Sequence, residues 1–147
     1  MSNVPALKRS PSGYQVVDTA QELYRKVIAM CIKLPKRYTP LVLQPFVELA
    51  SEVADNTKCA NSVFPHNQHE VQIRLDYWIV AKAKLQALSS KLNNISEIPS
   101  VLRYKVNNKE KGVTAHELDE IADLVDSEIN LIKNALDTDR KRFKKLP

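Results

Sequence analysis

The sequence predicts an all-α protein, most simply an antiparallel up-down bundle of four helices, on the strength of three observations. The 147 residues include only two glycines, Gly13 and Gly112, too few for the many tight turns of a sheet-rich fold. Apolar residues recur at helical spacing in four segments, and prolines or loop-forming residues separate those segments. A chain of this length is expected to form one domain with a sizeable core.

The N-terminal residues 1–15 are rich in proline and serine, and we expect them to form a flexible arm. Asp18 is a suitable N-cap for the first helix, which ends before Pro35 because a residue preceding proline avoids the helical conformation. The apolar stripe of this helix contains Ala20, Leu23, Tyr24, Val27, Ile28 and Cys31. The predicted organisation is therefore an arm at 1–15 and a bundle at 16–147.

The second helix follows the connector 35-PKRYTP-40, and its start is ambiguous in the sequence. Pro40 is a possible first helical residue behind a Thr39 cap, and Pro45 is the alternative. The helix is expected to run to about Asn61, since Pro65 prevents much further extension. Its apolar residues are Phe46, Leu49, Ala50, Val53 and Ala54.

The third helix has the clearest start, with Asn67 as N-cap and Glu70 completing a variant of the capping box. A helix from 67 to about 95 is roughly 43 Å long at 1.5 Å per residue. Two apolar rows recur every seven residues, which is typical of bundles. The rows are Val71, Trp78, Leu85 and Leu92, and Ala81, Leu88 and Ile95.

Residues 96–113 break the helical pattern and predict a long connector, with Pro99, the Asn107-Asn108 pair and Gly112. Thr114 and Glu117 then form a capping box for the fourth helix. Its core rows are predicted to be Leu118, Val125 and Ile132, and Ala122, Ile129 and Leu136. Four apolar residues lie off the core stripes, Ile73, Tyr77, Leu124 and Leu131, and either self-association or ordinary surface exposure explains them.

The segment 64-FPHNQHEVQIR-74 places two histidines and a glutamate close together, a combination that can indicate an enzymatic or metal site. A helical zinc protease site needs two histidines four residues apart with a glutamate beside the first, whereas His66 and His69 are three apart. No Cys or Asp nearby completes a ligand set, so we expect no metal and no cofactor. Glu70 is interpreted as a capping residue and the two histidines as surface residues.

Other catalytic arrangements are equally unsupported by the sequence. Ser62 or Cys59 beside a histidine lacks the flanking glycines of a nucleophile elbow and its oxyanion donors. The carboxylates Asp119, Glu120 and Asp123 lie at the start of the fourth helix, where they favour its positive end. We therefore expect a protein that is not an enzyme and has no catalytic residues.

The net charge of +5 is concentrated in two places. The last nine residues, 139-DRKRFKKLP-147, hold five basic residues against one acidic residue, a net charge of +4. Such a tail favours polyanionic partners, although it also complements a helix dipole and aids solubility. The predicted nucleic-acid-binding residues are Lys33, Lys36 and Arg37, and Arg140, Lys141, Arg142, Lys144 and Lys145. Tyr38 and Phe143 lie beside them and could stack on bases.

Several segments together resemble a bacterial four-helix bundle family. This family includes the 23S rRNA intervening-sequence proteins and the accessory variability determinant (Avd) of diversity-generating retroelements. The likeness covers about residues 17–146. It rests on 23-LYRKVI-28, 35-PKRY-38, 60-ANSVFPHNQHEVQIR-74, 118-LDEIADLVDSEINLIK-133 and 137-DTDRKRFKKL-146. The 96–113 connector and the N-terminal arm are longer than the family pattern.

The resemblance implies a homo-oligomer, a pentameric barrel of bundles, that binds a reverse transcriptase and nucleic acid, RNA or DNA, through basic surfaces. The positions that match are Lys36 and Arg37, and Arg140, Lys141 and Arg142. The alternative is a protein-interaction or scaffold module with no role in nucleic-acid binding. No apolar run is long enough to span a bilayer and the N-terminus lacks a secretory signal pattern, so a cytoplasmic protein without a membrane partner is expected.

Overall fold

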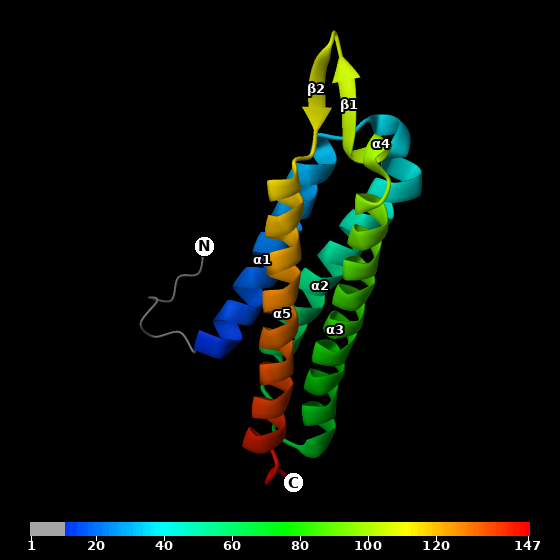
Figure 1. Ribbon diagram of the computed structural model, residues 1–147. Coiled ribbons are helices and arrows are strands. Elements are labelled where there is room, and N and C mark those ends of the chain that lie inside the picture. Colours follow the sequence, from blue (N-terminus) through cyan, green and yellow to red (C-terminus); the bar gives the residue numbers. More distant parts are fainter. Residues whose placement is uncertain (1–10) are drawn as a thin grey trace.

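The computed structural model describes residues 11–147, with side chains from residue 15 onward except at residue 100. In this part of the chain four long helices lie side by side (Figure 1): α1 (Pro11–Ile32), α2 (Gln44–Ser62), α3 (Gln68–Ser96) and α5 (Ala115–Arg142). Helices α1 and α3 each contact both α2 and α5, so the four helices surround a common core. The prediction of a bundle built from four long helices is confirmed.

Helix α1 begins earlier than the sequence predicted, at Pro11 rather than after Asp18. Proline is tolerated in the first turn of a helix because the N–H groups there have no helical acceptor. Residues 11–15, which were predicted to belong to the arm, are therefore helical. Asp18 lies inside α1 and does not cap it. Residues 1–10 of the predicted arm lie outside the described residues.

The start of the second helix combines the two alternatives. A short 3-10 turn, η2 (Lys36–Tyr38), leads into a π-helical turn, η3 (Thr39–Leu43), and this runs directly into α2. Pro40 and Pro45 each occupy one of the first two positions of a helical segment, where the missing N–H costs least. The predicted end near Asn61 agrees with the last residue of α2, Ser62.

The caps predicted for α3 and α5 are both present. The Asn67 side-chain oxygen accepts a hydrogen bond from the Glu70 N–H at 2.9 Å, and the Glu70 carboxylate accepts from the His66 N–H at 2.8 Å. At the start of α5, the Thr114 hydroxyl accepts from the Glu117 N–H at 3.2 Å, and the Glu117 carboxylate accepts from the Thr114 N–H at 3.4 Å. These contacts satisfy N–H groups that have no partner within the helix.

A long connector separates α3 from α5 at the predicted place, but it is not only loop. It contains a single helical turn, α4 (Pro99–Leu102), and a hairpin of two antiparallel strands, β1 (Arg103–Val106) and β2 (Lys109–Gly112). Asn107 and Asn108 form the turn with φ angles of 53° and 64°, because asparagine tolerates the left-handed conformation that a two-residue hairpin turn requires. The hairpin projects from one end of the bundle (Figure 1).

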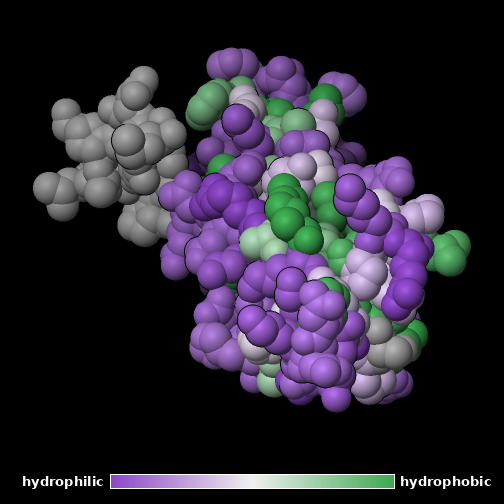
Figure 2. All heavy atoms as spheres, turned by 90° about the horizontal axis from the view of Figure 1, so that it is seen from above, coloured by the Kyte–Doolittle hydropathy of each residue, from purple (hydrophilic) through white to green (hydrophobic). Residues whose placement is uncertain are grey.

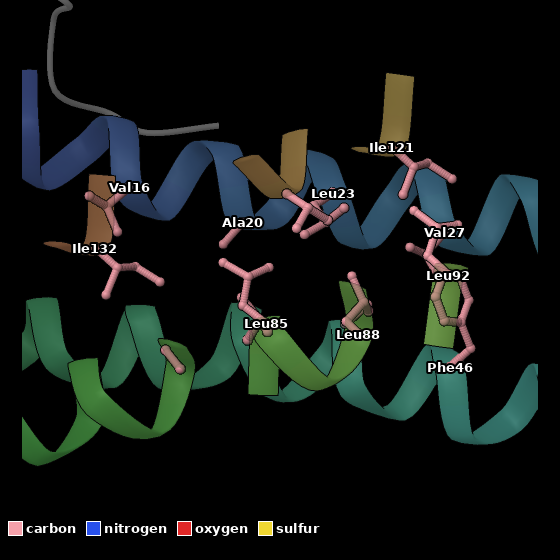
Figure 3. Packing of buried hydrophobic residues seen from close by; sticks show 14 of the residues in the cluster. Val16, Ala20, Leu23, Val27, Phe46, Leu85, Leu88, Leu92, Ile121 and Ile132 are labelled. Carbon is pink, nitrogen blue, oxygen red and sulfur yellow. The ribbon is translucent and has the colours of Figure 1, made fainter. Parts of the chain in front are cut away.

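The core runs the length of the bundle. Figure 3 shows apolar side chains of different helices pointing toward one another, among them Leu23 and Leu85, both fully buried. On α5, the second core row lies one position earlier than predicted. Its buried residues are Ile121, Glu128 and Ala135, whereas in the predicted row Ala122 and Ile129 are half-buried and Leu136 is buried. The apolar pattern missed this row because its central member, Glu128, is acidic.

The residues off the predicted stripes are mostly accounted for within one chain. Tyr77, Leu124 and Leu131 are half-buried and pack against the core, while Ile73 is exposed. The apolar side chains with the largest exposed fractions lie elsewhere, notably that of Leu41. Among the described helices, none is both long and apolar enough to cross a membrane.

Candidate nucleic-acid interface

The structure places the predicted basic residues at opposite ends of the bundle (Figure 1). Lys33, Lys36 and Arg37 follow the end of α1, next to the base of the hairpin. The five basic residues between 140 and 145 lie at the other end, at the C-terminus of α5. We call the two regions the hairpin end and the tail end. The predicted residues therefore form two separate groups.

The hairpin adds basic residues that the sequence prediction missed. Four of its side chains are basic and one, Glu110, is acidic, which gives the hairpin a net charge of +3. All four basic side chains are exposed. Together with the connector they form what we call the hairpin-end basic surface: Lys36, Arg37, Arg103, Lys105, Lys109 and Lys111.

Lys33 fastens this surface to the bundle. Its backbone carbonyl accepts a hydrogen bond from the Tyr104 hydroxyl on β1 at 2.9 Å, and its ammonium group pairs with the Glu117 carboxylate at the start of α5. The hydrogen bond that the Lys33 ammonium group donates to Glu117 is the main reason that the pKa of Glu117 lies below its ordinary value. Lys33, predicted to contact nucleic acid, thus connects α1, β1 and α5.

Lys36 and Arg37 lie on the turn η2 and are both exposed. Pro35 precedes them in an extended conformation, so α1 has ended and the turn stands apart from it. The Arg37 guanidinium lies 5.0 Å from the centre of the half-buried Tyr38 ring. The two charges are therefore available to a partner, and Tyr38 supports Arg37 as a cation–π partner.

The tail end is organised around a buried ion pair that joins α3 to α5. The Arg74 guanidinium donates to the Asp139 carboxylate at 2.7 and 3.4 Å, and the Trp78 indole N–H donates to the same carboxylate at 2.7 Å. Arg74 also donates to the carbonyls of Ala60 and Val63 at the end of α2, at 3.0 and 2.9 Å. This one cluster therefore holds three helices together, with both charges paired.

The chain beyond α5 is fastened to the start of α3. The Gln68 side-chain amide donates to the carbonyls of Phe143 and Leu146 at 2.8 and 2.9 Å, and the Gln68 N–H donates to that of Pro147 at 2.8 Å. The Phe143 ring lies between two guanidinium groups, 5.8 Å from that of Arg74 and 4.3 Å from that of Arg142. The ring therefore serves the protein's own packing, and we do not assign it a base-stacking role.

The remaining basic residues of the tail end are exposed. Arg140 and Arg142 each lie 3.9 Å from an aspartate of the same helix, Asp137 and Asp139 respectively. In the last turn of α5, these arginines also face the negative end of the helix dipole. Lys141, Lys144 and Lys145 are exposed as well. The neighbouring aspartates and the helix dipole therefore account for part of the positive charge at the tail end.

The histidine segment forms the corner between α2 and α3. His66 and His69 are exposed, and Glu70 accepts the backbone N–H of His66. Within the part of the chain that the structure describes, no three His, Cys, Asp or Glu side chains are placed to hold a metal ion. Glu70 therefore has a structural role at this corner, as predicted from the capping pattern.

Glu120, near the start of α5, is held in an ion pair with α1. The Glu120 carboxylate lies 3.0 Å from the Lys26 ammonium group and 2.8 Å from the His116 ring. The hydrogen bond from Lys26 lowers the pKa of Glu120, and the same contact raises the pKa of Lys26. The ion pair therefore moves both pKa values away from neutrality, whereas a general acid or base works best with a pKa near the operating pH.

One acid is buried without a partner. Glu128 is fully buried on α5, and neither carboxylate oxygen has a hydrogen-bond partner among the described residues. Burial raises its pKa to about 9, so the side chain is neutral at physiological pH.

Comparison of the chain with protein-family models, with curated proteins and with solved structures gives no match. The family resemblance therefore stays a prediction, and the function is argued from the surfaces described above.

Proposed function

We propose that this protein is a non-enzymatic accessory protein that binds nucleic acid. The proposal rests on the convergence of two separate segments, the connector at 35–38 and the hairpin at 103–112, in one exposed basic surface. Dispersed lysines and arginines on an exposed surface are what neutralisation of phosphates requires. The basic tail end is a second, independent point of contact.

The resemblance to the Avd family extends the proposal to architecture and partners. We propose an antiparallel up-down bundle that assembles into a homo-oligomer, pentameric by analogy, and that serves a reverse transcriptase or a structured RNA. The contact of α1 with α2 and α5, and of α3 with the same helices, supports the up-down order. Light scattering of the purified chain tests the oligomeric state, and co-purification with a reverse transcriptase tests the partner.

Fluorescence anisotropy with labelled RNA and DNA tests the central claim. We expect the full chain to bind at low salt, with an affinity that falls steeply as salt is added, because binding releases counterions from the phosphates. A variant with Lys36→Gln and Arg37→Gln should bind more weakly and with a shallower salt dependence. Absence of binding to any nucleic acid at low salt, with the tail intact, would refute the proposed function.

A protein-binding module is the second candidate, and one observation favours it. An apolar hollow lies at the hairpin end between η3, α3 and α4, and the side chains of Leu41 and Ile98 at its edge are 82% and 48% exposed. Figure 2, which views the molecule from this end, shows several small hydrophobic areas separated by hydrophilic residues. A chain that captures a protein, ignores nucleic acid, and loses capture on Leu41→Ser would establish this alternative.

A further inference from the structure

We propose that the β1–β2 hairpin enters the major groove of duplex DNA, with Asn107 and Asn108 at its tip reaching the base edges. In this arrangement the basic side chains of the strands contact the flanking phosphates. The inference rests on the proposed nucleic-acid-binding function and specifies which form of nucleic acid the hairpin end recognises.

The dimensions of the hairpin suit this groove. Each strand has four residues and thus extends roughly 14 Å at about 3.4 Å per residue. The major groove of B-DNA is about 12 Å wide and about 8.5 Å deep, and it admits a two-stranded ribbon. All residues of both strands are exposed except Tyr104 and Gly112, which are half-buried near the base. The tip can therefore enter the groove before the bundle reaches the duplex.

The hairpin is held in a fixed direction at its base. The Val113 N–H donates to the Leu102 carbonyl at 2.8 Å, and the Tyr104 hydroxyl donates to the Lys33 carbonyl at 2.9 Å. Gly112 has a φ of 124°, and a Cβ atom there would lie 1.9 Å from the Leu102 carbonyl oxygen. Only glycine allows this close approach, so the sequence is adapted to the way the hairpin leaves the bundle.

The strand register distributes the charges on two faces. Tyr104 pairs with Lys111, and Val106 pairs with Lys109, so these four side chains share one face, which has no acid. The other face carries Arg103 and Lys105 with Glu110. The Tyr104 hydroxyl contacts Lys33, so the acid-free face is the one toward the end of α1 and the exposed Lys36 and Arg37. A phosphate backbone passing the hairpin on that side meets basic residues from both segments.

The tip has the residue type that reads bases in this groove. Asn107 and Asn108 are both exposed, and asparagine can pair with the N6 and N7 atoms of adenine. Their amides are not needed as hairpin partners, since glycine forms the same turn. Double-stranded RNA is a poor alternative, because its major groove is too deep and narrow for side chains to read. A single strand offers no groove.

The test compares two variants that each remove two positive charges. One is Lys105→Gln with Lys109→Gln in the hairpin, and the other is Lys144→Gln with Lys145→Gln at the tail end. Anisotropy is measured on DNA duplexes, RNA duplexes and single strands of one sequence. We expect the wild type to prefer the DNA duplex. The hairpin variant should lose about tenfold in affinity for it at about 100 mM salt, with a salt slope lower by about two. The tail variant should keep the preference.

Two further probes distinguish groove entry from phosphate contact alone. A duplex whose pyrimidines carry bulky 5-substituents, which fill the major groove, should bind as weakly as the RNA duplex, whereas a minor-groove ligand should not compete. Asn107→Gly with Asn108→Gly should preserve the salt slope and reduce discrimination between sequences.

The outcomes separate the two proposals. If the wild type binds no nucleic acid, the proposed function itself is wrong. If it binds but does not prefer the DNA duplex, or if the two charge variants lose affinity equally, only the hairpin inference is overturned. Unchanged binding to the groove-filled duplex would also overturn it. Circular dichroism of each variant verifies that the helices are retained.

Discussion

The two ends of the bundle are both basic, but they are built differently. At the tail end the charges surround a buried ion pair, Arg74 with Asp139, and the chain terminus is hydrogen-bonded to α3 through Gln68. At the hairpin end the charges lie on an exposed ribbon attached only at its base. Positive charge alone therefore does not indicate function. What distinguishes the two ends is how far neighbouring residues of the protein already pair with the basic side chains.

The largest expected effect comes from breaking the ion pair at the tail end. Asp139→Ala leaves the buried Arg74 charge without its partner and the Trp78 N–H without an acceptor. We expect a loss of about 3–5 kcal/mol in the free energy of unfolding. Urea unfolding followed by the fluorescence of Trp78, the single tryptophan, measures it.

Two variants make that result specific. Asp137→Ala, two residues away and exposed, should change the free energy of unfolding by less than about 0.5 kcal/mol. Arg74→Met with Asp139→Leu removes both charges and should be less destabilised than Asp139→Ala alone. A double variant as unstable as the single one would mean that the pairing of charge is not what matters at this end.

Glu128, midway along α5, tests the same principle with a buried carboxyl group that has no hydrogen-bond partner among the described residues. Its pKa is raised from 4.5 to about 9, so the folded state keeps a proton that the unfolded state loses between these values. Stability should therefore fall as pH rises from about 4.5 to about 9. Glu128→Met removes this cost and should stabilise the fold by on the order of 3 kcal/mol at neutral pH.

The pH dependence identifies the cause. The stabilisation by Glu128→Met, measured by urea unfolding, should be smaller at about pH 5 than at about pH 8. Glu22→Met, at an exposed glutamate of α1, should show no comparable trend. A gain from Glu128→Met that is the same at both pH values would show that the carboxyl does not titrate with folding.

Gly112→Ala should act only at the hairpin end. The φ of 124° and the contact with the Leu102 carbonyl make any side chain strained, at a cost of about 1–3 kcal/mol to the hairpin. Amide hydrogen exchange should accelerate in β1 and β2 while α3 stays protected. Val106→Ala, near the tip and 40% exposed, should leave the hairpin protected. Faster exchange throughout the helices would mean that the hairpin and bundle unfold together.

The smallest effect is expected from Gln68→Ala. It removes the side-chain hydrogen bonds that fasten residues 143 and 146 to the start of α3, each worth about 1 kcal/mol. Carboxypeptidase should trim the C-terminus faster, with little change in urea unfolding. Gln72→Ala removes a hydrogen bond to Asp76 of the same helix and should leave the trimming rate unchanged.

The elements that could be predicted are those encoded by neighbouring residues. Asn67 with Glu70, and Thr114 with Glu117, set the starts of two helices through contacts three residues apart. The seven-residue recurrence of Val71, Trp78, Leu85 and Leu92 likewise identified a buried row. Such signals depend on local geometry, and a single sequence shows them directly.

The hairpin was missed although a local signal was present. A two-residue Asn-Asn turn between two four-residue segments fits a hairpin, but the segments are polar and show no buried face. Because the two segments lack an alternation of apolar and polar residues, the hydrophobic pattern predicted a loop there. The same limitation hid Glu128 and Asp139, because acidic residues are seldom assigned to a core.

By itself the sequence determined the four long helices, the caps of α3 and α5, and the two basic segments, since these follow from spacing along the chain. Only the tertiary structure decided that residues 36–37 and 103–111 meet at one end, that Asp139 is paired, and that Glu128 is not. Whether a buried charged group has a partner depends on side chains that are far away in the sequence, and only the packing of the helices brings those side chains together.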